Sequence, residues 1–206
     1  DIQGQSNGDT TDPFTFDAIS NFNRTLFSSG TGILTATKAA DVSTANPGQT
    51  LTYTVEGSNT GSADVIGLVH TNISLDTDST PEAREGILIV DELDDAKLAV
   101  GDKYAGITDA TVSGPTKARI VYWNDGDNTC QLTAANASWT TTPKIALFIP
   151  DADSVATKTA GDGVAGSVLT PGQGYKFSFK INVQSPYSPT EPKLIENQVE
   201  ATYYDG

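Results

Sequence analysis

The chain has 206 residues, of which 26 are acidic and 12 are basic, so its formal net charge is −14 at pH 7. A surface this acidic repels nucleic acid and anionic membranes, and we expect neither as a partner. Hydrophobic residues make up 37% of the chain, which is enough for one large β domain, and no apolar run approaches the length of a membrane span.

The composition also bears on where the protein is found. The sequence contains no Met and begins with Asp1. We therefore expect a processed chain that has lost a signal peptide and lies outside the cell or on its surface; a chain trimmed for expression is the alternative. The single Cys130 cannot form a disulfide within the chain, and a buried thiol is expected.

Residues 1–32 differ from the rest of the chain and are predicted to form an extended N-terminal arm. Its first part, "DIQGQSNGDTTDP", is polar and typical of a flexible segment. Phe14 and Phe16 have the spacing of one face of a strand, whereas the pattern over 17–27 is irregular and allows a short helix. So much apolar surface must be buried against something. The apolar residues of the arm are Phe14, Phe16, Ile19, Phe22, Leu26 and Phe27.

Residues 33–206 predict short strands separated by polar turns, which is typical of an all-β, immunoglobulin-like antiparallel β-sandwich. We expect one helical turn at most over 94–107, a bulge at Gly67, and a hairpin in which 137–143 pairs with 117–129. The apolar segment 144–152 should be a central strand. Predicted strands cover 32–41, 50–59, 64–75, 87–93, 117–129, 137–143, 144–152, 174–184 and 194–206.

One pattern occurs twice. "NPGQTLTYTV" at 46–55 and "TPGQGYKFSF" at 170–179 both place Pro-Gly-Gln before an alternating strand. Pro fixes φ and Gly accepts positive φ, so each begins with a turn. A duplicated hairpin and the independent use of a favourable turn are both compatible with this pattern.

Two stretches carry a resemblance to a known family. "LTATKAADVSTANPGQTLTYTVEGSNTGSADVIGL", within 33–68, resembles the start of the immunoglobulin-like domain called DUF11, and "IENQVEATYYDG" resembles its closing strand. "GILIVDEL" matches the middle of that domain loosely. The resemblance implies a prokaryotic cell-surface protein. That family often forms repeats in long stalks, whereas this chain has one copy, which leaves room for a single-domain subunit.

Few residues suit catalysis, and we do not expect an enzyme. The chain has one His, so most pairs of nucleophile and base are excluded, and His70 is interpreted as an ordinary strand residue. One His and one Cys make no zinc site. We expect no cofactor, although calcium could bridge loops that are acidic; solvated turns are the alternative. The acidic clusters are 76–79, 91–95, 124–128 and 151–154.

Two kinds of modification are considered. Some surface proteins of similar fold join a Lys amine to an Asn side chain, and Lys38 and Asn197 lie on the expected first and last strands, with Glu56 as the assisting carboxyl group. The alternative is an exposed Lys38 and an Asn197 that caps the sheet. Asn-x-Ser/Thr sequences, which accept N-glycans in some organisms, occur at Asn23, Asn72 and Asn136.

The arm and the sandwich together suggest a function. A sandwich has exposed strand edges, and a neighbouring chain can cover one by adding a strand. We predict a structural subunit of an extracellular filament or surface layer, a homopolymer built by donation of the arm; an arm packed on its own domain is the competing arrangement. The alternative function is a carbohydrate- or protein-binding adhesion module. Its aromatic candidates are Tyr122, Trp123, Trp139 and Tyr187.

Overall fold

A computed structural model describes residues 30–74, 82–115, 117–124, 129–150, 168–186, 195 and 198–202. The chain divides into two units, Asp1–Gly30 and Thr31–Gly206, and all of the described strands belong to the second. Several sequence predictions lie outside the described residues. They concern the arm with Phe14, Phe16, Ile19, Phe22, Leu26 and Phe27, the short helix over 17–27, and Asn23, Tyr187 and Asn197.

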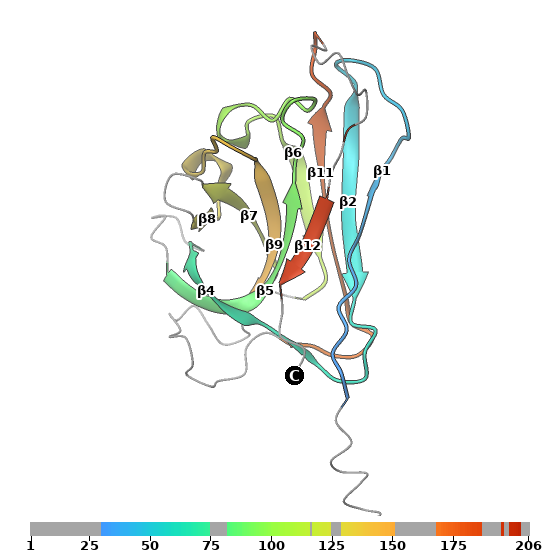
Figure 1. The fold of residues 1–206 in the computed structure, drawn as a ribbon, viewed down its shortest axis with the longest axis vertical. Helices are drawn as coiled ribbons and strands as arrows, with labels where there is room; N and C mark the ends of the chain where they lie inside the picture. Colours follow the sequence, from blue (N-terminus) through green and yellow to red (C-terminus); the bar gives the residue numbers. More distant parts are fainter. Residues whose placement is uncertain are drawn as a thin grey trace, which may run out of the picture. The chain divides into compact units, whose positions relative to one another are not determined.

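The described part of the second unit is an all-β sandwich, as the alternating strands predicted (Figure 1). A four-stranded sheet has the order β1-β2-β11-β6, and a six-stranded sheet has the order β12-β5-β4-β8-β7-β9. The strands are β1 (Thr37–Ala40), β2 (Thr50–Ser58), β3 (Val65–Ile66), β4 (Leu68–Ile73), β5 (Glu82–Glu92), β6 (Thr108–Ser113), β7 (Arg119–Asn124), β8 (Thr129–Gln131), β9 (Lys144–Pro150), β10 (Val168–Leu169), β11 (Gly174–Asn182) and β12 (Gln198–Thr202).

The centre of the four-stranded sheet is the antiparallel pair β2 and β11. Leu51 lies opposite Ile181, and Val55 lies opposite Phe177. All four are buried, because alternate residues of both strands face the second sheet. The residues between them are polar and face outward, so this pair has the simple alternation that the sequence showed.

The two Pro-Gly-Gln turns have the same geometry at opposite ends of this pair. Gly48 and Gly172 have φ values of 81° and 85°. Gly48 N–H donates to the carbonyl of Val183, and Gly172 N–H donates to the carbonyl of Asn59, so each turn closes on the end of the other strand. The repeated motif therefore begins each strand of one antiparallel pair.

Strands β5 and β9 are buried on both faces. Ile87, Ile89 and Leu147 belong to the main core between the sheets. Leu88 and Phe148, from the intervening positions, belong to a second, smaller core. This explains why 145–150 is a continuous apolar run, and it confirms that β9 is a central strand.

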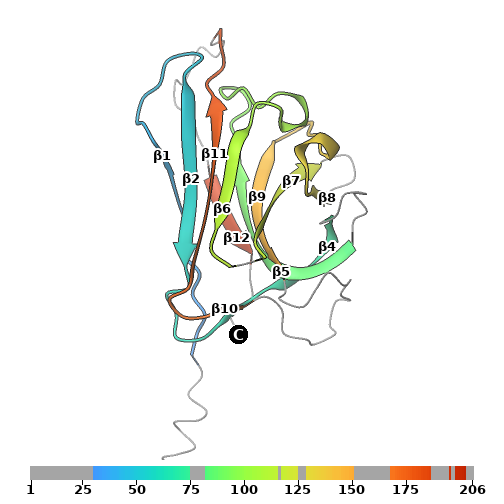
Figure 2. The ribbon, with the colours of Figure 1, turned by 180° about the vertical axis from the view of Figure 1, so that it is seen from behind.

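The second core exists because the six-stranded sheet curls on itself. β5 pairs with β9 and β4, β9 pairs with β7, β7 with β8, and β8 meets β4 through one parallel bridge, so these pairings form a closed circuit. Figure 2 shows the long, bent β5 at the base of this curl. One half of the sheet therefore packs on the other sheet, and the other half encloses its own core.

Two sequence predictions need correction. Residues 137–143 form no strand, and β7 pairs with β8 and β9 instead. Gly67 is not a bulge within one strand, because it separates β3 from β4. The helical turn expected over 94–107 is present as the 3-10 helix η1 (Asp102–Tyr104), and a second one, η2, spans Ala134–Asn136. None of the helices in the described ranges is long and apolar enough to span a membrane.

Two glycines allow very close packing around β5: Gly67, just before β4, lies against Gly86 of β5, and Gly86 lies against β9. A Cβ on Gly67 would lie 2.3 Å from the Cα of Gly86, and a Cβ on Gly86 would lie 2.5 Å from the carbonyl oxygen of Ile149. Both distances are shorter than real Cβ contacts allow, so the approach of the β3–β4 junction to β5 and the packing of β5 on β9 require glycine at these positions.

We predict that Gly86→Ala destabilises the domain by roughly 3 kcal/mol, because the added methyl group must displace backbone atoms in a packed core. Urea unfolding of the whole chain measures this. Gly172→Ala is the control: its Cβ would meet nothing within 4 Å, so only its positive φ opposes the change, and about 1 kcal/mol is expected. Equal losses for both variants would contradict the close packing around Gly86.

Candidate functional site

The first candidate site is the outer edge of the four-stranded sheet. β6 is the last strand in its order, so one side of its backbone has no strand partner in the described part of the sheet. Val112 lies opposite Phe177 and therefore points to the same, inner face. Phe177 is fully buried, yet Val112 is 39% exposed. An inner-facing apolar side chain is exposed here because the second sheet does not reach over it.

Strand β7 of the second sheet lies beside β6 across this opening (Figure 2). Its Ile120 and Tyr122 face the main core but are only partly buried, as are Ile107 and Ala110. A strip of incompletely covered apolar side chains therefore runs between the two sheets. We call it the β6–β7 seam, and it consists of Ile107, Ala110, Val112, Ile120 and Tyr122.

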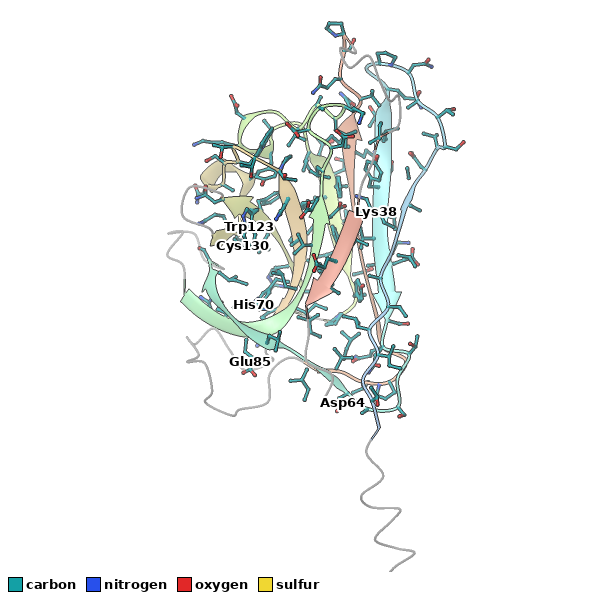
Figure 3. All side chains as sticks on the ribbon, in the orientation of Figure 1. Lys38, Asp64, His70, Glu85, Trp123 and Cys130 are labelled. Atoms are coloured by element: carbon teal, nitrogen blue, oxygen red, sulfur yellow. The ribbon has the colours of Figure 1, made fainter. Side chains whose placement is uncertain are left out.

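The opposite side of the sandwich differs from the seam. β1 and β12 lie beside each other there, and the inner-facing residue of β1, opposite Val55, is Lys38. Its Nζ forms an ion pair and hydrogen bond with Oδ1 of Asp91. The exposed fractions of the two side chains are 8% and 0%. Figure 3 shows Lys38 on the side of β1 that faces the second sheet.

The buried pair connects the two sheets. Asp91 belongs to β5, between Ile145 of β9 and Val199 of β12, and the ammonium group of Lys38 lies 4.6 Å from the ring centroid of Tyr53. Burial lowers the pKa of Lys38 to about 8 and raises the pKa of Asp91 to about 6, although each charge offsets part of the other's shift. The second oxygen, Oδ2 of Asp91, is buried without a hydrogen-bond partner.

Lys38 was singled out from the sequence, but its observed partner was not. Glu56 lies opposite Thr37, one residue away from Lys38, and forms a 3.5 Å ion pair with Lys176 on the outer face. The structure therefore does not place Glu56 as the assisting carboxyl group. In the sequence, Asp91 is part of an acidic cluster, but its position two residues after Ile89 on an apolar strand indicates that it faces inward.

In the acidic cluster that the structure describes in full, 91–95, two carboxylates are paired with lysines. Asp91 is buried against Lys38, and Asp94 lies 2.7 Å from Nζ of Lys97. No group of three His, Cys, Asp or Glu side chains that could hold a metal is present among the described residues. Clusters 76–79 and 151–154 lie outside them, as does 124–128 except for Asn124.

The aromatic candidates for ligand binding are largely covered. Tyr122 and Trp139 pack against the main core, and Trp123 packs against the second core beneath Lys144. In the described ranges the exposed large apolar side chains are Ile33, Val42 and Val112, and none is aromatic. No flat aromatic platform for a sugar ring is therefore found on this part of the surface.

The remaining candidate residues are found as follows. Cys130 is a buried thiol, as predicted, and burial raises its pKa to about 12, so it is unreactive. Asn136 is exposed on η2 and accessible to a glycan. Asn72 belongs to β4, but its side chain lies outside the description.

Comparisons with known proteins add little. No family model and no curated protein matches the chain. A solved structure titled "AvmM Catalyzes Macrocyclization in Alchivemycin A Biosynthesis" aligns over 82% of this chain and 87% of its own, with 10% identity and a TM-score of 0.29. A likeness this weak supports no conclusion about activity, and the resemblance to DUF11 stays a prediction.

His70 lies on β4 in the curled half of the sheet, opposite Arg84 of β5. Its Nε2 lies 3.0 Å from the carbonyl oxygen of Gly86, and its ring meets Phe148 edge to face. Burial lowers the pKa of His70 below its ordinary 6.5, although the Gly86 carbonyl opposes this shift. These contacts agree with the prediction that His70 is an ordinary strand residue.

We predict that His70 makes the domain sensitive to acid. Between pH 6.5 and its lower folded pKa, the unfolded chain binds a proton that the folded chain does not. The contribution of His70 to stability therefore falls as the pH falls, by at most about 1.4 kcal/mol per pH unit. His70→Gln should flatten this dependence and keep a donor to Gly86. Because the chain has one His, identical pH dependence in the two proteins would contradict the prediction.

Proposed function

We propose that this protein is a structural subunit of an extracellular filament or surface layer, in which the arm of one subunit adds a strand along the β6–β7 seam of the next. The observation that carries the proposal is Val112: it lies on the inner face of the sandwich and is nevertheless exposed. A sandwich that is complete at this edge would have covered it.

The composition of the arm suits this seam. An added strand would pair with the outer side of β6 through backbone hydrogen bonds, and its alternate side chains would enter the gap between the sheets. Phe14 and Phe16 have that spacing. Two aromatic rings would cover Val112 and Ala110 and contribute roughly 2–3 kcal/mol each through burial.

Donation of this kind builds an open polymer. The donating arm and the accepting seam are different surfaces, so the contact is heterologous, and it grows into a filament unless the rotation closes a ring. The net charge of −14 disfavours unspecific association of subunits through their exposed strand edges. The partner is then another copy of this chain, and no catalysis or membrane insertion is required.

A binding module is less well supported. It needs exposed aromatic side chains on one face, and the described surface presents none. Experiments must distinguish donation of the arm to a neighbouring subunit from packing of the arm on the β6–β7 seam of its own subunit.

We predict that removal of residues 1–30 abolishes filaments and leaves a soluble, folded monomer, since Thr31–Gly206 is a compact unit. Negative-stain electron microscopy and circular dichroism measure the two properties. If the arm instead completes its own domain, the shortened chain should unfold or aggregate.

We also predict that Val112→Lys prevents polymerisation of the full chain, because an ammonium group would lie where the donated strand packs. Val42→Lys is the matched control: Val42 is 37% exposed, close to the 39% of Val112, but lies next to β1. Both variants should fold, and only Val112→Lys should lose filaments. Equal filament formation in the two variants would exclude the β6–β7 seam as the acceptor.

A further inference from the structure

We propose that Lys38 and Asp91 condense into an internal amide bond that joins the two sheets of the sandwich covalently. The inference concerns the folded domain alone and does not depend on filament formation. It also differs from the sequence prediction, which paired Lys38 with Asn197 and used Glu56 as the assisting group.

The positions of Lys38 and Asp91 favour formation of the bond. The backbone on both sides is fixed by strand pairing: Lys38 lies opposite Val55, and Asp91 is held between Ile145 and Val199. The amine nitrogen and a carboxylate oxygen are already in direct contact. Two groups held together in this way react as if at a very high concentration, because the entropy of bringing them together has been lost during folding.

Burial favours the product over the ion pair. Both side chains are almost fully inaccessible, and Oδ2 of Asp91 has no hydrogen-bond partner. Two opposite charges are costly in such a site, whereas an amide is neutral. Burial also moves the pKa values of the amine and the acid towards each other. The neutral amine and neutral acid are therefore populated more than in water, and these are the reacting forms.

The reaction balances without any other reactant. The lone pair of neutral Lys38 Nζ attacks Cγ of protonated Asp91, a C–N bond forms, and the electrons of the C=O double bond move to its oxygen. The tetrahedral adduct then reforms C=O and breaks one C–O bond. The hydroxyl group leaves with a proton from the nitrogen, as one water molecule. Nothing is oxidised or reduced.

The bond would close a loop between β1 and β5, across a sequence separation of 53 residues. A cross-link over such a distance stabilises chiefly by restricting the unfolded chain. The single Cys130 cannot provide a disulfide within the chain, so this amide would supply the covalent connection that many secreted domains obtain from cystines.

Mass spectrometry of the full chain tests the proposal. We expect an intact mass lower than that of the sequence by one water molecule. Trypsin should fail to cleave after Lys38, and peptide 25–84 should remain joined to peptide 85–97. The second buried pair, Lys97 and Asp94, is the internal control. It lies in a local turn, and cleavage after Lys97 should be normal.

Two variants locate the bond. Lys38→Met and Asp91→Ala should each restore the full sequence mass, and Lys97→Arg should keep the loss of water. A folded wild-type chain with the full sequence mass, cleaved normally after Lys38, would overturn the proposal, and so would a loss of water that persists in Lys38→Met. The wild-type peptide map is decisive even if a variant fails to fold.

Discussion

Burial of β5 and β9 on both faces is the constraint on which the rest of this domain depends. Their alternate side chains must enter two different cores, so each face needs a cover. The four-stranded sheet covers one face, and the curled half of the second sheet covers the other. The close approach of Gly67 to Gly86 follows from this curl, because β4 must approach β5 to complete the circuit of strand pairs.

The same arrangement makes the two sides of the sandwich unequal. On the side of β1 and β12, the gap between the sheets contains the buried pair of Lys38 and Asp91. On the side of β6 and β7, it contains apolar side chains that are only partly covered. One side therefore has a buried polar connection between the sheets, and the other side has apolar side chains that a further strand would cover in our proposal. This difference is the physical basis of the proposed head-to-tail assembly.

Sequence patterns predicted the elements whose environment is simple. β2 and β11 each face one core, so their alternation identified them, and the Pro-Gly-Gln turns identified where they begin. The pairing of these two strands with each other could not be predicted, because it joins segments more than a hundred residues apart, as does the hydrogen bond from Tyr175 to the carbonyl of Thr35. The curl could not be predicted for a different reason: a strand that is buried on both faces has no alternation to interpret.

The candidate site was predicted only in part. The position of Lys38 on the first strand made it a candidate. Asp91 lies in an acidic cluster, which suggests a solvated turn, whereas its spacing from Ile89 and Leu93 places it on the inward face. The exposure of Val112 on the inner face of the sheet could not be predicted from the sequence, because it depends on how far the opposite sheet extends. The contacts of the arm depend on a second molecule or on a folded-back chain, and no local pattern determines which.

The most direct measurement is a structure of the assembled protein by cryo-electron microscopy at a resolution that separates strands. Our account predicts a filament in which an additional strand from the neighbouring subunit runs along β6, with the rings of Phe14 and Phe16 between the two sheets. Density for an arm that returns to its own subunit, or a filament in which the β6–β7 seam stays uncovered, would contradict it.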